Sequence, residues 1–411
     1  MASSTIDHLV SVIVFIAALV IFLGLFSQTN QTALTYERHR ALSTKTSDLL
    51  DTMLLNPGLP NNWATSNSVP TGFGVQDPEF TQYQLSSFSL MRLSPSSGTT
   101  VEFDKTLQGT LYNEASLGAG TSLLTSKAQA LNYSAASKLL GINGTYGFQL
   151  SLTPTITVSI VENQAASPLS LSITSYGTGF PFANAVVNYC LILVNTNQNP
   201  DQCPSYTIQN GAVSTDTDGV TAPITFPIVT NSNQAYAFIA YAHLDGIVGV
   251  GYHTRSLTND QNVIPIVENT ATQKVALAHS YDLNNSGPPN SILNYNSTLL
   301  ISREDYTLRE LSIGSTNSSG ILTSGNGYPY PSLTLPSSTT GILIVTYQNS
   351  AGQGGVKMMP WGVSSLAFPV TFGGTIGGQE WVATDIRQVI IGGIAYQAKL
   401  ALWSLSYQVN N

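Results

Sequence analysis

The most regular hydrophobic pattern in the chain is an apolar run from Leu9 to Phe26, in which Ser11 is the only polar side chain. A run of about 18 to 20 helical residues matches the roughly 30 Å hydrocarbon core of a bilayer. Backbone polar groups can cross lipid only when they are satisfied internally, so the run predicts a membrane-spanning helix. The side chains expected to face lipid or neighbouring helices include Leu9, Val12, Phe15, Ile16, Leu19, Phe22, Leu23 and Phe26.

Two other interpretations of this run are weaker. A cleaved secretory signal has a basic start, a shorter apolar core and a small-residue cleavage site. Here the stretch MASSTID holds no Lys or Arg, and Ser27 to Thr32 is a poor cleavage site. A buried helix of a water-soluble protein would need a core wrapped around all of its faces. We therefore expect an uncleaved anchor.

Apolar residues recur at helical spacing beyond the run, from Thr32 to Leu55, where neither Gly nor Pro occurs. Asn56-Pro57-Gly58 then gives a strong stop signal. The pattern predicts one helix from about Thr5 to Leu55, with its first half in lipid and its second half as an amphipathic stalk outside. That stalk must pack on its own head domain or on neighbouring copies.

The rest of the chain predicts a mainly β fold, in which a long N-terminal transmembrane and stalk helix (residues 1–56) precedes β-sandwich-type extracellular domains. Residues 57–164 are expected to form the first part of a β-rich head, and their stretch 59–121 is turn-rich, with short alternating runs typical of strands. Within them, residues 122–140 show apolar spacing that predicts a short amphipathic helix ending at Gly141. Tyr146 to Val161 predicts a strand, or a bent strand pair broken at Pro154.

Residues 165–255 contain short predicted strands at a spacing of about 8 to 12 residues. Their segments PFANAVVNYCLI and STDTDGVTAPITFPI resemble an immunoglobulin-like β-sandwich of the kind repeated in adhesins and surface proteins. Residues 256–411 hold further strands, and Gly392-Gly393 indicates a hairpin. Alternating polarity favours strands over a second membrane helix at Val389 to Leu405. We expect the segments on either side of the sandwich to form one β-rich head.

The composition separates this chain from ordinary soluble domains. Only 9% of its residues are charged and 42% are hydrophobic, whereas about 25% are charged in a typical soluble domain. Hydroxyl, amide, glycine and tyrosine residues must therefore form most of the surface, which suits an extracellular location. The net charge of −8 and the lack of Lys/Arg clusters exclude nucleic acid as an expected partner, because phosphate binding needs grouped cations.

Charges near the run give a conflicting signal for topology. Arg38, Arg40 and Lys45 follow the run, and the positive-inside rule would place that side in the cytoplasm. The nearest of these cations lies twelve residues beyond Phe26, and Glu37 stands beside them. We therefore expect the N-terminus inside and the large C-terminal domain outside the cell.

Cysteine and asparagine positions give candidate modifications. Cys190 and Cys203 are the two cysteines, and in an exported chain they predict a disulfide, with two free buried thiols as the alternative. Sequons of the form N-x-S/T mark glycosylation only outside the cell. They occur at Asn30, Asn132, Asn143, Asn284, Asn296 and Asn317, and in a chain so rich in Asn, Ser and Thr several arise by chance.

The sequence holds no G-x-S-x-G, H-E-x-x-H, phosphate-loop or C-x-x-C motif. His243 and His253 flank a predicted hairpin and, with Asp245, form a weak candidate metal site, for which ordinary strand residues are the simpler interpretation. Asp216 and Asp218 resemble half of a calcium loop, but their pattern fits a β-turn better.

Two further groups of residues have a functional and a structural interpretation. Glu304 and Asp305, flanked by Arg303 and Arg309, form the densest charge cluster, which we interpret as surface ion pairing. The tryptophans and the 19 tyrosines offer stacking surfaces for carbohydrates or partners, with core packing as the alternative. The tryptophans are Trp63, Trp361, Trp381 and Trp403.

Several N-terminal segments carry a likeness to a known group of proteins. They are the apolar helix, its extension ALTYERHRALSTKTSDLLDTMLLNPG, the motif LLNPG-x-P-x-NW at Leu54 to Trp63, and the later segment ALNYSAASKLLGINGTYGFQLSLTPTITVSI. They resemble archaeal pilin-like, single-pass surface membrane proteins. The resemblance implies a membrane-rooted helix with an external β-rich head, in some members built into filaments. Unlike classical type IV prepilins, this chain has no basic leader and no Glu near the start of the run.

These observations predict a non-enzymatic cell-surface structural protein without a cofactor. The N-terminal helix would anchor it in the lipid bilayer or assemble it with copies of itself or other pilin-like subunits, as a filament subunit or in surface adhesion, and glycans are a further candidate partner. The alternative is a membrane-anchored carbohydrate- or protein-binding module. A surface hydrolase is the most remote alternative.

Overall fold

The structure is a computed structural model of the 411-residue chain. Strands predominate in it and one long N-terminal helix precedes them, so the expected fold class is confirmed. The described residues are 2–80, 82–93, 99–102, 111–118, 121–165, 168–196, 202–227, 234–257, 263–279, 293–311, 332–336, 339–349, 351–377 and 381–405.

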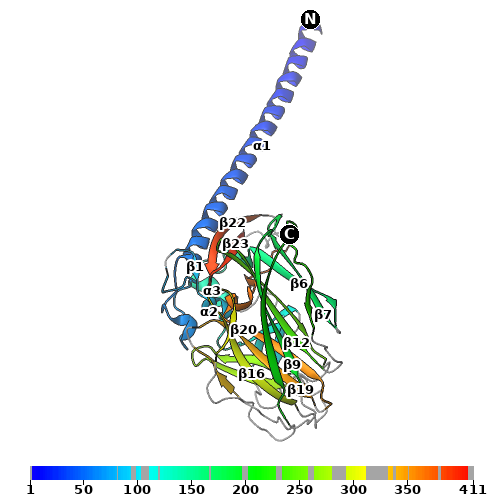
Figure 1. Ribbon diagram of the computed structural model, residues 1–411. Helices are drawn as coiled ribbons and strands as arrows, with labels where there is room; N and C mark the ends of the chain where they lie inside the picture. Colours follow the sequence, from blue (N-terminus) through cyan, green and yellow to red (C-terminus); the bar gives the residue numbers. More distant parts are fainter. Residues whose placement is uncertain are drawn as a thin grey trace.

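Helix α1 (Ala2–Leu54) projects from the β-rich head as a rod (Figure 1). Its 53 residues correspond to about 80 Å at the standard helical rise. The predicted continuous helix from about Thr5 to Leu55 is therefore confirmed. Gly58, at φ +85°, takes a left-handed conformation just beyond the helix, where the stop signal was predicted.

A five-stranded sheet lies at the foot of α1, in the order β1-β22-β23-β5-β21. Gly392 and Gly393 have φ values of +54° and +84°, as a two-residue hairpin turn requires. The predicted C-terminal hairpin is thus confirmed, and Figure 1 shows it beside α1. The strands are β1 (Gln84–Leu85), β5 (Tyr146–Pro154), β21 (Val370–Gly373), β22 (Val382–Ile391) and β23 (Ile394–Ser404).

Two antiparallel sheets form a sandwich, with orders β11-β7-β6 and β10-β9-β12-β13, and β8 pairs with β7. The chain enters the sandwich directly from β5, because the break after Pro154 separates β5 and β6 into different sheets. The strands are β6 (Ile156–Gln164), β7 (Leu169–Gly177), β8 (Phe180–Pro181), β9 (Val186–Asn195), β10 (Ser205–Ser214), β11 (Ile224–Phe226), β12 (Tyr236–Leu244) and β13 (Ile247–Arg255).

A ten-stranded sheet forms the rest of the head. Like the five-stranded sheet, it takes strands from before and after the sandwich. Its main path is β17-β16-β19-β20-β4-β14-β15-β18, and β3 and β2 extend from β4. The strands are β2 (Thr99–Glu102), β3 (Leu111–Gly118), β4 (Thr121–Ser126), β14 (Val263–Asn269), β15 (Lys274–His279), β16 (Leu293–Ser302), β17 (Leu308–Leu311), β18 (Ser332–Thr334), β19 (Gly341–Asn349) and β20 (Gly354–Trp361).

The sheet that contains β9 and β12 is buried on both faces. Leu191 packs in the sandwich core, whereas the neighbouring Cys190 and Ile192 belong to the main core of the head. The main core also includes Leu50 and Met53 of α1. The foot of α1 is therefore part of the head's own core, and the helix is not attached through a flexible linker.

The helix predicted over residues 122–140 is wrong in its first half. Leu123 and Leu124 lie in β4, which pairs with β3, and α3 (Tyr133–Leu139) is the helical part. Over so few residues the apolar spacing fits both periods, and pairing with a distant strand decides between them. Gly141 follows α3 at φ +67°, as predicted for the residue that ends it.

Candidate functional site

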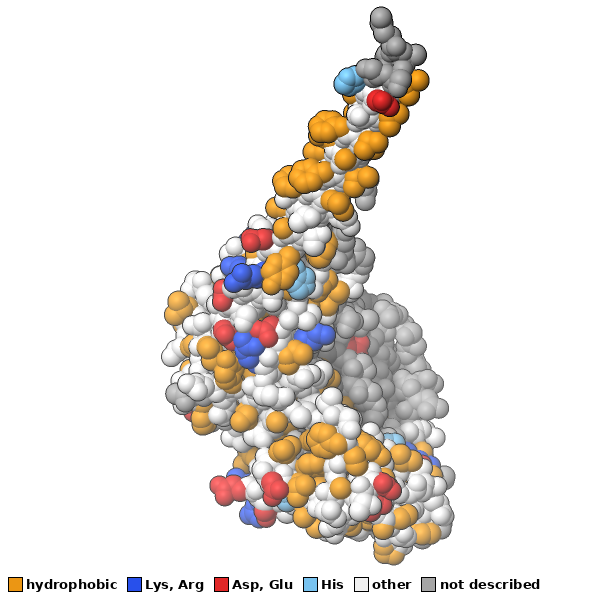
Figure 2. Space-filling model, turned by 90° about the horizontal axis from the view of Figure 1, so that it is seen from above, with side chains coloured by type: hydrophobic (Ala, Val, Ile, Leu, Met, Phe, Trp, Pro, Cys, Tyr) orange, Lys and Arg blue, Asp and Glu red, His pale blue; other side chains and the backbone are white. Residues whose placement is uncertain are grey.

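The most distinctive surface of the molecule is the projecting part of α1. Its large apolar side chains between Ile6 and Phe26 are 46% to 67% exposed, and the most apolar 18-residue window has a mean hydropathy of 3.1 with none of it buried. Figure 2 shows hydrophobic side chains covering this part of the rod. Among the described helices, α1 is the one long and apolar enough to cross a membrane.

The apolar side chains point in every direction around the helix axis. Four successive residues, from Val12 to Phe15, are all apolar and all exposed. A helix that is apolar on every face belongs in lipid or in the centre of a bundle. The hydroxyl of Ser11 donates to the backbone oxygen of Asp7 at 2.8 Å, so the polar group in the run is satisfied within the helix, as a hydrocarbon environment demands.

Residues 27–41 form a polar spacer between the apolar run and the head. Leu34 and Tyr36 are 58% and 70% exposed, and the remaining side chains of the spacer are exposed as well. At about 1.5 Å per residue the spacer is about 22 Å long. The helix contacts the head from Leu42 onward, so the first part of the expected stalk does not pack on its own head, and its packing on neighbouring copies stays a prediction.

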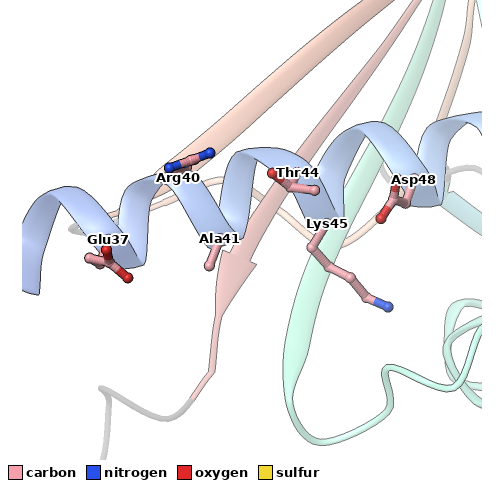
Figure 3. A pocket seen from close by; sticks show the side chains of 6 residues that line it. All are labelled: Glu37, Arg40, Ala41, Thr44, Lys45 and Asp48. Atoms are coloured by element: carbon pink, nitrogen blue, oxygen red, sulfur yellow. The ribbon is translucent and has the colours of Figure 1, made fainter.

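A shallow groove runs along α1 where the spacer meets the head, and α1 supplies all of its lining residues (Figure 3). In Figure 3, Glu37 and Lys45 point downward from the helix and Arg40 lies at its upper edge. The lining residues recur at spacings of three and four, so the acidic and basic side chains follow one another along one face of the helix. The lining residues are Glu37, Arg40, Ala41, Thr44, Lys45 and Asp48.

The foot of α1 presents one apolar stripe to the head. Leu42 is 8% exposed and Leu50, Met53 and Leu54 are fully buried, packed in the core shared with β22 and β23. The hydroxyl of Thr46 is also buried and donates to the backbone oxygen of Leu42 at 2.7 Å. The predicted packing of the stalk on its own head is correct for this stretch.

An ionic contact joins the foot to β22. The Arg387 guanidinium lies 3.2 Å from Asp51 and 2.7 Å from Asp385, and it donates to the hydroxyl of Ser47 at 2.8 Å. Burial alone would raise the pKa of Asp385, but hydrogen bonds from Ser47, the Ile386 amide and Arg387 hold that pKa below its usual value. The contact fixes the rotation of α1 against the sheet.

The LLNPG-x-P-x-NW motif forms the turn that ends α1. Trp63 is fully buried, and its indole N–H donates to the backbone oxygens of Pro57 at 2.9 Å and Gly74 at 3.2 Å. The left-handed Gly58 lies against this ring, and a Cβ there would come within 2.7 Å of the indole nitrogen. The Val75 amide donates to the Met53 carbonyl at 2.9 Å, which satisfies a carbonyl left free at the helix end.

Arg92 completes this turn, and no motif or spacing in the sequence points to it. Its guanidinium lies 5.3 Å from the centre of the Trp63 ring and donates to the backbone oxygens of Trp63, Ser66 and Gln129. Burial lowers the pKa of Arg92. A buried cation satisfied by carbonyl oxygens holds the loop after α1 in one conformation.

The predicted disulfide is wrong for this fold, because no disulfide joins Cys190 and Cys203. Cys190 pairs with Asn210 in the β9–β10 ladder, whereas Cys203 precedes Ser205, which pairs with Asn195. The pair Cys190–Asn210 and the pair Asn195–Ser205 are five residues apart along the ladder, which corresponds to about 17 Å. The Cα atoms of a disulfide lie within about 7 Å. Burial, with the charge of Glu310, raises the pKa of Cys190 to about 12.

The sequons lie in different environments. Asn30 and Asn143 are exposed, on α1 and in the turn before β5. Asn132 is exposed, but its side-chain oxygen caps α3, and Asn296 is half-buried within β16. Glycosylation at any of them stays a prediction. Two further sequons lie outside the described residues, at Asn284 and Asn317.

The histidine pair does not converge on a metal site. His243 and His253 lie at opposite ends of the β12–β13 hairpin, and Asp245 lies in its turn. His243 packs on Tyr306 with ring centres 4.6 Å apart, and His253 lies 3.9 Å from Glu162. Burial lowers the pKa of both histidines. The described residues contain no group of three or more His, Cys, Asp or Glu placed to hold a metal ion.

The aspartates and the charged loop have local structural roles. The side chain of Asp216 accepts hydrogen bonds from the amides of Asp218 and Val220, both at 2.9 Å, so the predicted β-turn is confirmed. Hydrogen bonds from Thr307, with the charge of Arg303, lower the pKa of Asp305. The other charged residues of that cluster, Glu304 and Arg309, are exposed.

The tryptophans are mostly core residues. Trp63, Trp361 and Trp403 are at most 3% exposed, whereas Trp381 is 39% exposed. The indole N–H of Trp361 donates to the backbone oxygen of Pro336 at 3.0 Å. Core packing is therefore the correct interpretation for three of the four.

No family model matches this chain, and no curated protein matches it. Among solved structures, Escherichia coli alpha-2-macroglobulin activated by porcine elastase shares 9% identity over 68% of this chain and 25% of its own length, with a TM-score of 0.22. Red sea bream transglutaminase shares 10% identity over 61% of this chain and 37% of its own length, with a TM-score of 0.17. The chain spans well under two thirds of either protein, and neither likeness bears on its function.

Proposed function

We propose that this chain is a non-enzymatic, single-pass protein of the cell surface, anchored by α1 and carrying its β-rich head outside the cell. One observation carries the proposal: the run Leu9 to Phe26 is apolar and exposed on every side. Its exposed apolar surface needs a partner that the head does not supply. A bilayer is such a partner, because the length of the run matches the hydrocarbon core.

The continuity of α1 supports an architectural role. The same helix contains the apolar run and the core residues Leu50 and Met53, so the head is joined to its anchor by a rigid rod. Copies that associate through their apolar helices would hold their heads in a fixed relation. This is the layout of a pilin-like subunit, in a filament or in a surface layer.

Membrane retention of the full chain tests the anchor. Wild type should stay in the membrane fraction after an alkaline wash. Phe15→Arg combined with Leu19→Arg should release the protein, because each charge at the centre of a spanning helix costs about 2.5 to 3.5 kcal/mol. The matched control is Leu34→Arg combined with Tyr36→Arg, in the polar spacer of the same helix, which should be retained like wild type. Release of the wild-type chain by the wash would contradict the proposal.

Extraction in mild detergent tests the assembly half separately. Sizing and electron microscopy should show oligomers or filaments of the wild-type chain. A protein that is retained in membranes but is strictly monomeric after extraction would support the anchoring role and contradict the assembly role.

A further inference from the structure

Strand β10 forms an open edge of the sandwich. It pairs with β9 at every position from Ser205 to Ser214 without a register shift, and no described strand lies on its other side. Half of the backbone N–H and C=O groups of such a strand point away from its single neighbour. Over ten residues, this is a long row of unpaired donors and acceptors.

The sequence of β10 carries none of the usual protections of a sheet edge. Natural edges are blunted by Lys, Pro, bulges, short length or a covering element. The strand reads SYTIQNGAVS, which holds no charge and no proline. Its exposed side chains are small or of medium size, and they include Thr207, Asn210 and Ala212. An approaching strand would therefore meet neither charge repulsion nor bulk.

The other long edges of the described sheets are covered or charged. The β13 edge packs against β6, because Gly249 and Gly251 let its backbone approach Ile156 and Val158 closely. The β22 edge lies against α1 and carries Asp385 and Arg387. The β6 edge is covered in turn by β13, and strands β1, β2, β11, β17, β18 and β21 are short. β10 is thus the long edge that the described structure leaves open.

The side chains of β10 do not close this edge. Tyr206 leans toward the ten-stranded sheet, and its hydroxyl donates to Glu310 at 2.6 Å. Tyr206 and Ile208 pack on the main core, on the face of the sheet and not along its edge. The backbone edge beside Gln209 and Asn210 stays free of described hydrogen-bond partners beyond β9.

We propose that the free edge of β10 pairs antiparallel with β10 of a second copy of this chain, which joins two four-stranded sheets into one. A neutral edge is complementary to itself, and a twofold axis is the commonest way for copies to associate. In an antiparallel pair, side chains directly opposite each other lie on the same face of the sheet. A twofold axis must therefore pass through a pair of equivalent residues, and we place it at Gln209 or Asn210. Both lie at the middle of the strand, so nearly its whole length pairs. The contact involves the head alone and is independent of the membrane role of α1.

Disulfide trapping in the detergent-solubilised full chain tests this contact. In a Cys203→Ser background, where Cys190 is buried, Gln209→Cys and Asn210→Cys are compared, and the one that lies on the axis should give a covalent dimer under mild oxidation. Thr384→Cys, exposed on β22, is the matched control and should stay monomeric. Adding Thr207→Lys and Ala212→Lys to the variant that forms the dimer should lower the dimer yield at least tenfold, while the melting temperature and membrane retention stay unchanged. A yield at position 384 equal to that at positions 209 and 210, or no dimer at either 209 or 210, would overturn the proposal.

Discussion

The two ends of α1 are both rich in leucine, yet they meet their surroundings in opposite ways. Between Ile6 and Phe26 the apolar side chains point in all directions and are exposed, Phe15 by 67%. Between Leu42 and Leu54 they form one stripe and are buried, Met53 completely. The arrangement of apolar residues around the axis, and not their number, therefore separates the part that needs an external partner from the part that belongs to the head.

The two ends of α1 therefore have different roles: the foot stabilises the fold of the head, and the apolar run determines where the protein is located. Burial of the foot contributes to the folding of the head, because its side chains leave water when the core forms. The apolar run contributes nothing to that core. Substitutions at the foot should change the free energy of unfolding, and substitutions in the run should change whether the protein is retained in the membrane.

The largest expected effect is at the turn that ends the foot. Trp63→Ala should lower the free energy of unfolding by about 3 to 5 kcal/mol, because it removes a fully buried ring and leaves a cavity. Denaturant unfolding of the full chain in detergent measures it. Trp381→Ala is the control: its ring is 39% exposed, and the change should stay within about 0.5 kcal/mol. Similar losses of unfolding free energy for both variants would contradict the role of Trp63 as the buried residue that stabilises the turn.

The next effect compares the two ends directly. Leu50→Ala should cost about 2 to 5 kcal/mol, as expected for a buried leucine. Leu19→Ala, the same substitution in the exposed run, should leave the unfolding of the head unchanged. Both can be measured by the same denaturant titration. A destabilised Leu19→Ala head would mean that the run packs on the head, against the comparison drawn above.

The smallest effect is at the ionic contact of the foot. Arg387→Met should cost about 1 kcal/mol or less near neutral pH, because the contact is partly exposed. The folded pKa of Asp385 is lowered, so its contribution is present above the unfolded value of about 3.9. It is lost as the pH falls through the lower folded pKa.

The pH dependence of that substitution provides its control. Denaturant titrations at pH 7 and at pH values below about 4 should show the difference between wild type and Arg387→Met shrinking in acid. A difference that grows in acid, or that does not depend on pH, would show that the arginine acts through packing instead of through Asp385.

Features set by nearby residues could be predicted from the sequence. The continuous helix, its end at Asn56-Pro57-Gly58 and the Gly392-Gly393 hairpin each depend on a few adjacent side chains and on local backbone preferences. The burial of the foot was predictable as well, because the apolar stripe of Leu49, Leu50 and Met53 repeats at helical spacing.

Features set by distant partners could not be predicted. Asp51 and Arg387 are 336 positions apart, and neither has a sequence pattern that points to the other. Arg92 stands in a turn-rich segment with no sign that it would lie on Trp63. The disulfide prediction was wrong for the same reason, because spacing along the chain does not reveal the strand register that separates Cys190 from Cys203.

The most direct test of the account is the depth of α1 in a bilayer. An environment-sensitive fluorophore attached at Leu19→Cys or at Leu34→Cys, in the Cys203→Ser background, reports the surroundings of the run and of the spacer in reconstituted vesicles. We expect the label at position 19 to be quenched by brominated lipid and shielded from iodide, and the label at position 34 to show the reverse. Equal quenching of both labels by iodide would contradict the membrane-spanning role of α1.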